Sequence, residues 1–325
     1  MAKVNSAVGI EYDSHEIRAV ELTKNSDNSY RVTGYGSVTI KEGVISEGIV
    51  TDAPIFSAAL EDLFKQSGIK NTSPIVVGVN NENVIMRYAT FPKVPQDKLR
   101  GVIMMQAQDF IPVPISELGL DFVVIDETVD DDDQPALNVL LVGARSNMLQ
   151  NLISNFESAK MEVVDIDSSF LAWTRVAIKE QPQDSVFAFL KLTDDVLNFV
   201  AVSDGDIKMV RSINIPDRAA IEIKKAFNEG DEITTLELET ITDFLYSELS
   251  SSMNYFQMQT NQLIGNVLFS ASTVLEDRIA QVLGEKCYVP LTVPAFYNEY
   301  MSSSFSPKNF AGCISLAKVA LEGYA

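Results

Sequence analysis

The residues nearest the N-terminus that suggest chemistry form an acidic turn. The stretch VGIEYDSHEIRAVEL, residues 8–22, predicts a strand, a tight turn and a second strand with alternating apolar residues. A turn of this kind can cradle a phosphate with its backbone N–H groups, yet this stretch carries Glu11, Asp13 and Glu16. Because like charges repel, these side chains disfavour a phosphate ligand.

The other side chains near this turn do not form a catalytic constellation. His15 is the only histidine of the chain, so a histidine pair and a zinc site are excluded, and we expect an exposed turn residue. The carboxylates Glu11, Asp13 and Asp195 are interpreted as solvated turn formers rather than metal ligands. We therefore expect no catalytic residue and no metal.

The composition excludes several classes of protein. The chain has 325 residues, of which 46% are hydrophobic, enough for two domains with a substantial core. A formal charge of −20 without a dense Lys/Arg cluster disfavours nucleic acid and anionic lipid surfaces. Cys287 and Cys313 are interpreted as reduced thiols. No signal peptide or apolar run of roughly 18 residues is found, so we expect a cytoplasmic protein that reaches a membrane through a partner.

The acidic turn lies in a pattern of elements that occurs twice. Residues 8–40 predict three strands, followed by a helix that begins at Thr51 or Asp52 and ends at Gly68, and by a buried strand over 74–80. The second occurrence consists of three strands over 186–215, a long helix over 234–259, a strand over 265–272 and a C-terminal helix over 309–324. The repetition indicates two duplicated α/β units.

A segment of different character separates the two units. The elements expected in it are a helix over 96–110, strands over 120–127 and 137–145, a helix over 146–160 and a strand over 161–167. The aspartates of residues 130–133 are interpreted as a solvated hairpin loop. This arrangement is typical of a compact αβ module, and such modules commonly serve as docking platforms.

The layout resembles the actin-like ATPase superfamily and, more narrowly, the PilM family of type IV pilus assembly, which is related to the division protein FtsA. The similarity covers nearly the whole chain. It is carried by GVISEGIVTDAPIFSAALEDLFKQSGIK, RYATFPKVPQDKLRGVIMMQAQDFIPVPISELGLDFVVID, LNVLLVGARSNMLQNLI and ELSSSMNYFQMQ. The resemblance implies an α/β fold of the actin-like ATPase (ribonuclease H-like) type, with two duplicated halves and an αβ module inserted in the first half.

The resemblance also implies domain boundaries. The first actin-like subdomain is expected over 1–84 and 166–181, and the inserted docking module over 85–165. The second half is expected over 182–325, with a helical subdomain at about 216–262.

Three turns that hold a nucleotide in the family depart from its pattern here. The family's G-I-D-I-G-S becomes residues 9–14, with Asp13 in place of a glycine. Its D-I-G-x-x-x-T is matched to residues 189–195, so Phe189 replaces the acidic residue and Lys191 the glycine. The degenerate turns comprise Glu11, Asp13, Ser14, Phe189, Lys191, Thr193, Ser270, Ala271 and Ser272. We expect neither ATP nor magnesium to bind, and we expect Lys191 to pair with Asp13 across the closed cleft.

The resemblance implies a protein partner. A cleft between the first subdomain and the inserted module is expected to receive the N-terminal cytoplasmic segment of a PilN-like membrane protein, by strand addition or by anchored side chains. The residues expected to line this cleft are Tyr88, Phe91, Pro92, Phe110, Ile111, Pro112 and Arg145. Alternatively, these aromatics and prolines pack the module's own core. Tyr255 and Phe256 are expected in the core.

The expected function is therefore that of a non-enzymatic scaffold at the inner face of the plasma membrane. Motor or platform proteins of the pilus and a second copy of the chain are further candidate partners. Three alternatives stay open: a member of the family that binds Mg-ATP and is regulated by it, the cytoplasmic actin-like component of a type II secretion system, and an FtsA-like filament former.

Overall fold

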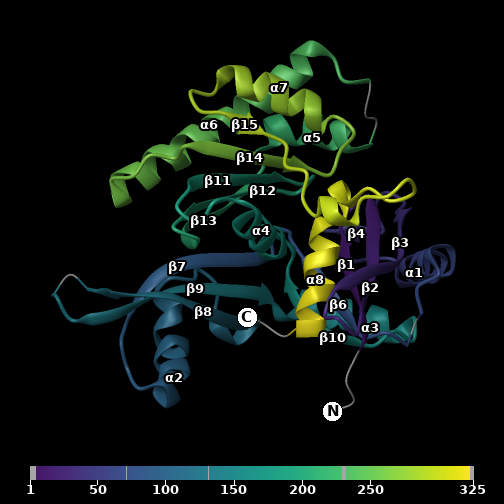
Figure 1. The fold of residues 1–325 in the computed structure, drawn as a ribbon, viewed down its shortest axis with the longest axis horizontal. Helices are drawn as coiled ribbons and strands as arrows, with labels where there is room; N and C mark the ends of the chain where they lie inside the picture. The colour runs from purple at the N-terminus through teal and green to yellow at the C-terminus, as the bar shows by residue number, and fades with distance from the viewer. Residues whose placement is uncertain (1–4, 71, 131, 229–231, 323–325) are drawn as a thin grey trace.

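Two five-stranded sheets with one shared topology dominate the computed structural model, which describes residues 5–70, 72–130, 132–228 and 232–322 (Figure 1). The first sheet contains β1 (Ser6–Tyr12), β2 (Glu16–Lys24), β3 (Tyr30–Thr39), β6 (Ile75–Val79) and β10 (Val163–Ser168). The second contains β11 (Val186–Leu192), β12 (Val196–Ser203), β13 (Asp206–Asn214), β14 (Asn266–Ala271) and β15 (Leu291–Thr292).

Each sheet is centred on its first strand. On one side of that strand two further strands follow, each antiparallel to its neighbour. On the other side two strands follow that pair in parallel, which gives the orders β10-β6-β1-β2-β3 and β15-β14-β11-β12-β13. The expected duplication of an α/β unit is confirmed by this shared order.

Helices cover the first sheet on both faces. On one face lie α1 (Ala53–Ser67) and α3 (Ser146–Ser158), and on the other α4 (Ser169–Glu180) and α8 (Ala311–Glu322). Helix α1 begins where Asp52 Oδ1 accepts a hydrogen bond from the N–H of Ile55, and it ends at Gly68, whose φ is +68°. Helix α8 comes from the end of the chain and packs against β1, β2 and β6, so the two ends of the sequence share one core (Figure 1).

Three helices cover one face of the second sheet, and α4 contacts β11 and β12 on the other. Helices α5 (Asp217–Asn228), α6 (Thr235–Thr260) and α7 (Glu276–Lys286) share a core with its strands. The short elements are β4 (Ile45–Ser46), β5 (Ile49–Val50) and the 3-10 turns Ala107–Asp109, Ile115–Glu117, Asn298–Tyr300 and Pro307–Asn309.

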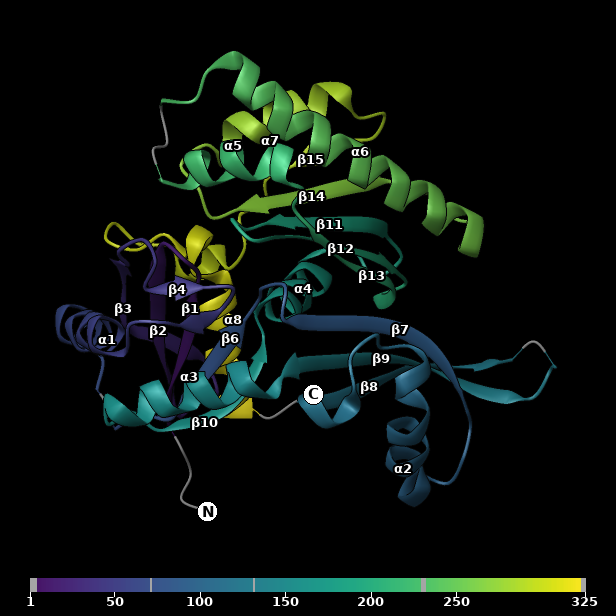
Figure 2. The ribbon, with the colours of Figure 1, turned by 180° about the vertical axis from the view of Figure 1, so that it is seen from behind.

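A separate three-stranded sheet projects beside the two halves (Figure 2). It consists of β7 (Val84–Pro92), β8 (Leu118–Val129) and β9 (Pro135–Arg145) in the order β7-β9-β8, with α2 (Gln96–Gln106) packed on one face. The β8–β9 hairpin contains the expected aspartate loop, of which Asp131 lies outside the described residues.

The last strand expected in the inserted module does not join this sheet. Strand β10 pairs in parallel with β6 of the first sheet, and α3 packs on the first core through Met148, Leu152 and Phe156. Both β10 and α3 were expected in the module because they are close to its other elements in the sequence. The strand with which a parallel strand pairs, however, is set by the path of the chain.

An aromatic core joins the halves and the three-stranded sheet. It contains Trp173 of α4, Phe187 and Phe189 of β11, and Met86 of β7. In the part of the chain that the structure describes, none of the helices combines the length and the apolar character that crossing a bilayer requires.

Candidate functional site

The first turn already holds an anion, its own Asp13 carboxylate. Asp13 Oδ1 accepts hydrogen bonds from the backbone N–H groups of His15 and Glu16, both at 2.9 Å, and Oδ2 lies 3.1 Å from Arg18 Nη2. Burial raises the pKa of Asp13, while the Arg18 charge opposes that shift. The turn amides that could bind a phosphate are thus occupied by a side chain.

In the other two turns, too, side chains accept hydrogen bonds from backbone N–H groups. Thr193 Oγ1 accepts hydrogen bonds from the N–H of Val196 at 3.0 Å and of Asp195 at 3.4 Å. In the third turn Glu276 Oε1 accepts one from the N–H of Ala271 at 2.8 Å. The residues present therefore do not fit a nucleoside triphosphate, because these turn amides are occupied by side chains and the turns carry several carboxylates.

The first two turns contact each other directly. The Ser14 hydroxyl donates to Asp194 Oδ2, and His15 Nε2 lies 3.2 Å from the same oxygen. The imidazole also stacks on Phe227, with ring centroids 5.9 Å apart. The expectation of an exposed His15 was wrong, since its side chain is 19% exposed. Burial alone lowers the pKa of His15, but the hydrogen bond to Asp194 and the charge of Asp194 raise it on balance.

Lys191 does not occupy the position expected from the family pattern. The hairpins of the two halves close with the pairs Tyr12↔Ile17 and Leu192↔Leu197. This register makes Lys191 the counterpart of Glu11, inside a strand, and Phe189 the counterpart of Gly9. The expected match to residues 189–195 is shifted by two residues, because β11 runs on to Leu192.

A buried indole separates Glu11 from Lys191. Trp173 Nε1 donates to Glu11 Oε1 at 2.8 Å, and Lys191 Nζ lies 3.8 Å from the centroid of the Trp173 ring. The expected pair between Lys191 and Asp13 was wrong: among the described residues Lys191 Nζ has no hydrogen-bond partner, and Asp13 pairs with Arg18. Burial lowers the pKa of Lys191 to about 8.

Helix α8 closes over this arrangement. A Cβ at Gly312 would lie 2.3 Å from Trp173 Nε1 and 2.4 Å from Glu11 Oε1, so the close approach requires glycine. The third predicted turn takes no part: Ser270 and Ala271 are the buried end of β14, followed by Ser272.

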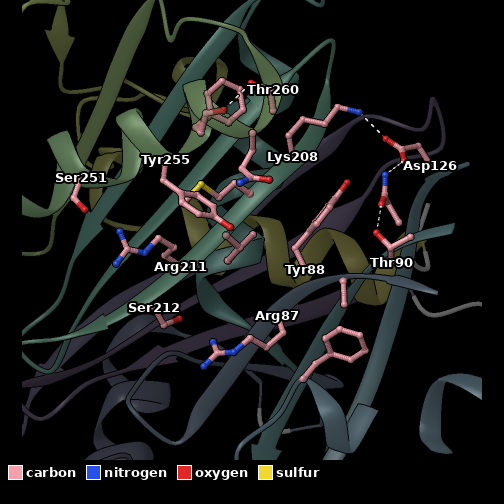
Figure 3. Close-up of a pocket in the computed structure, with 17 residues that line it drawn as sticks. Arg87, Tyr88, Thr90, Asp126, Lys208, Arg211, Ser212, Ser251, Tyr255 and Thr260 are labelled. Atoms are coloured by element: carbon pink, nitrogen blue, oxygen red, sulfur yellow. Dashed lines mark hydrogen bonds and ion pairs between the residues drawn. The ribbon is translucent and has the colours of Figure 1, made fainter. Parts of the chain in front are cut away.

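A second candidate site is a cavity of about 1100 Å³ between the three-stranded sheet and the second half (Figure 3). We call it the β7–β13 groove. Its lining residues are Arg87, Tyr88, Ala89, Thr90, Phe110, Asp126, Asn138, Lys208, Met209, Val210, Arg211, Ser212, Ser251, Tyr255, Phe256, Gln259 and Thr260.

Two strand edges face the β7–β13 groove. Successive side chains of a strand point to opposite faces, yet residues 87–90 of β7 and 208–212 of β13 line the groove without a gap in the sequence. Such runs indicate that the groove follows the backbone edges. Within the described residues β7 pairs with β9 and β13 with β12, and both are terminal strands of their sheets.

The groove combines aromatic rings with a polar floor. Phe110 is 38% and Tyr255 53% exposed. Lys208 Nζ pairs with Asp126 at 2.6 Å, and Asn138 links Asp126 to Thr90 through two hydrogen bonds (Figure 3). Such a surface offers apolar contacts and fixed polar groups to one ligand.

Of the residues expected to bind a peptide, the structure brings Tyr88 and Phe110 together in the groove. Phe91 and Ile111 are each 1% exposed and pack the core under α2, as the alternative interpretation had it. Exposed Pro92 and Pro112 do not line the groove. Arg145 Nη1 lies 3.6 Å from Glu117 instead.

The location of the groove also differs from the expected cleft. Its second wall consists of β13 and α6, not of the first half, and sequence reasoning missed Lys208, Arg211 and Tyr255. Phe256 is buried as expected, but Tyr255 faces outward. The helical period of α6 could have separated these neighbours, since adjacent residues on a helix point about 100° apart.

Comparison with known proteins gives one family and several structures. A model of the family "Type IV pilus assembly protein PilM" matches residues 9–215. The "PilM-PilN type IV pilus biogenesis complex" is similar, with a TM-score of 0.79 and 19% identity over 98% of this chain and 99% of that one. The cytoplasmic domain of EpsL, an inner membrane component of the type II secretion system of Vibrio cholerae, has a TM-score of 0.51 at 10% identity, covering 98% and 96%.

A third similar structure is the ethanolamine utilization protein EutJ of Carboxydothermus hydrogenoformans, with a TM-score of 0.52 and 11% identity over 98% and 90% of the two chains. Identities this low show the fold alone. That fold is the actin-like ATPase fold predicted from the sequence.

Proposed function

Because the chain belongs to the PilM family of type IV pilus assembly proteins, we propose that it is a scaffold that binds the N-terminal tail of a PilN-like membrane protein in the β7–β13 groove. Through this tail it is held at the inner face of the plasma membrane. It binds the tail without hydrolysing ATP.

The single observation that carries the proposal is the pair of strand edges along the groove. An extended peptide gains main-chain hydrogen bonds when it adds to a terminal strand, and the pockets beside the edge select its side chains. The runs 87–90 and 208–212 provide such edges on both walls, and Tyr88, Phe110 and Tyr255 provide the apolar contacts. Binding by strand addition thus agrees with the geometry of this groove.

The absence of hydrolysis is supported by the three turns. Asp13, Thr193 and Glu276 satisfy backbone amides of the turns, and Ser14 and Asp194 join the first two turns where a triphosphate would have to enter. A nucleotide would therefore have to break these contacts and approach several carboxylates.

The test is peptide binding measured by calorimetry or fluorescence anisotropy. A synthetic peptide with the N-terminal sequence of a PilN-like protein should bind, and Tyr88→Ala and Tyr255→Ala should each weaken binding at least tenfold. Met258→Ala is the matched control, because Met258 lies on the same helix, is 81% exposed and does not line the groove. No binding at high micromolar peptide, or an equal loss in the control, rejects the assignment.

Nucleotide binding is tested separately. A ligand of the native state raises its melting temperature by mass action. The melting temperature in millimolar Mg-ATP should equal the melting temperature in NaCl of the same ionic strength. A saturable rise with Mg-ATP supports the alternative of a family member regulated by nucleotide.

A further inference from the structure

The polar side chains of the β7–β13 groove form one row across the three-stranded sheet. Thr90 of β7 pairs in register with Asn138 of β9, and Asn138 pairs with Asp126 of β8. Cross-strand partners lie on the same face of a sheet, so these three side chains lie side by side (Figure 3). Lys208 of β13 lies at the Asp126 end of the row, with Nζ 2.6 Å from Asp126 Oδ2.

The hydrogen bonds between these side chains run in one direction. Thr90 Oγ1 donates to Asn138 Oδ1 at 3.0 Å, and Asn138 Nδ2 donates to Asp126 Oδ1 at 2.6 Å. The direction is set by the Asp126 carboxylate, which can only accept. Thr90 is exposed on the terminal strand β7 and lines the groove. Because its single proton is already donated, the Thr90 hydroxyl offers a ligand only its acceptor lone pairs.

The other face of β7 offers apolar contacts beside Thr90. Side chains of a strand alternate between its faces, so Ala89 and Phe91 point to the face that α2 covers, where both belong to the apolar core. Phe110 extends this face into the groove: its ring centroid lies 5.2 Å from that of Phe91, and it is 38% exposed. The edge of β7 is thus polar at Thr90 and apolar on the opposite face.

We propose that the tail adds to β7 and presents to Thr90 a side chain that donates a hydrogen bond, with an apolar residue on each side of that donor. This inference rests on the proposed function and adds the side-chain chemistry that the groove selects. A strand that extends the sheet beyond β7 continues its cross-strand rows. The tail residue beside Thr90 therefore lies on the polar face, and its two neighbours lie on the face of Phe110.

A tail with an acceptor at this position would have to disrupt the row. The Thr90 hydroxyl would turn its proton away from Asn138 Oδ1, and Asn138 cannot reverse its amide because Nδ2 donates to Asp126. Asn138 Oδ1 would lose its donor, which opposes binding. A carboxylate on the tail would also meet the net charge of −20 of the chain. An amide, hydroxyl or ammonium group meets neither obstacle.

The experiment is a substitution scan of a synthetic peptide with the N-terminal sequence of a PilN-like protein, measured by fluorescence anisotropy on the full chain. Each position of the peptide is replaced in turn by Asn, Ala and Asp. At one position Asn should bind roughly fivefold more tightly than Ala, as one hydrogen bond predicts, and Asp more weakly than Ala. At both neighbouring positions, replacement of the apolar residue by Asn or Asp should weaken binding.

The variant Thr90→Val removes the acceptor and keeps the shape of the side chain. In this variant Asn and Ala at the donor position should bind alike, because the tail donor has lost its partner. Thr128→Val is the matched control and should keep the preference for Asn, since Thr128 lies on β8 of the same sheet and does not line the groove.

The inference is overturned if no position of the peptide prefers the donor, or if Thr90→Val keeps the preference unchanged. Its failure differs from a failure of the proposed function. If the peptide binds and Tyr88→Ala weakens it while the preference is missing, the groove assignment stands and this inference alone is rejected. If no peptide of the scan binds, both are rejected.

Discussion

The ammonium group of Lys191 lies 3.8 Å from the centroid of the Trp173 ring, while the N–H of the same ring donates to Glu11. The indole thus contacts β1 of one half at its edge and β11 of the other half at its face. In this chain a buried tryptophan occupies the space between the two central strands, so the halves are joined by side chains of the protein itself.

The first prediction concerns the free-energy cost of burying the Lys191 ammonium group. Its pKa is lowered from 10.5 to about 8 in the folded state, so between these values the unfolded chain binds more protons and stability rises with pH. Lys191→Met should therefore be more stable than the unmodified chain at pH ~7, by about 2 kcal/mol, and the difference should vanish towards pH ~10.5. Urea unfolding across this pH range measures it.

The control for Lys191 uses the single tryptophan of the chain. Emission of Trp173 should titrate with a midpoint near pH 8 in the unmodified chain and should be flat in Lys191→Met. An equal titration in both proteins would assign the signal to another group.

Removing the indole donor should destabilise the fold. Trp173→Phe keeps an aromatic ring but removes the N–H that lies 2.8 Å from Glu11 Oε1, which retains the Ser169 hydroxyl as a donor, and a hydrogen bond to a charged group contributes about 1.5–3 kcal/mol. Unfolding followed by circular dichroism measures the loss. If Lys191→Met changes stability equally in the Trp173→Phe background and in the unmodified chain, the contact of Lys191 with the ring is energetically neutral.

Asp195 should make the protein less stable as pH rises. Its pKa is raised from 3.8 to about 7, so the native state holds the proton more tightly than the unfolded chain, and stability is lost as pH increases between these values. Asp195→Asn should remove this loss and be more stable at pH ~8 by about 2 kcal/mol. A variant whose pH profile runs parallel to that of the unmodified chain would speak against it.

His15 should stabilise the fold when its side chain is charged, whereas Asp195 should destabilise the fold when its side chain is charged. Because the folded pKa of His15 is raised, the contribution is complete below the unfolded value of 6.5 and is lost as pH rises through the folded value. His15→Gln should lower stability by about 1 kcal/mol at pH ~5.5 and by less at pH ~8.5. Melting curves of both proteins at the two pH values measure this difference. A larger loss of stability in His15→Gln at the higher pH would contradict the pairing of His15 with Asp194.

Strand addition in the β7–β13 groove predicts sensitivity to the peptide backbone. A series of PilN-like tail peptides, each N-methylated at one position, should lose affinity at alternate positions, because every second N–H of an added strand points to the edge it joins. Anisotropy measures the series. Uniform tolerance of methylation would leave side-chain anchoring as the mode of binding.

Much of the fold could be predicted from local patterns. The alternation after Gly9 predicts a hairpin, Asp52 and Gly68 mark the ends of α1, and the repeated order of strands predicts two equivalent sheets. These features depend on neighbours within a few residues, whose propensities and hydrophobic period are visible in the sequence. The loss of a glycine at Asp13 is visible in the same way.

The positions of the reactive groups depended on the tertiary structure. Residues 187–192 are all buried, so β11 shows no alternation that could place Lys191 in register. The pair of Asp13 with Arg18, the contact of Ser14 with Asp194 and the sheet that β10 joins are likewise set by the register of strands and the path of the chain.

The sequence by itself thus determined the type of fold, the duplicated halves and the acidic character of the turns. Only the tertiary structure decided that Tyr88 shares a groove with Lys208 and Tyr255, and that Trp173 separates Glu11 from Lys191. The reason is physical: local propensity acts between neighbours in the chain, whereas these contacts form between segments that meet only when both sheets have packed.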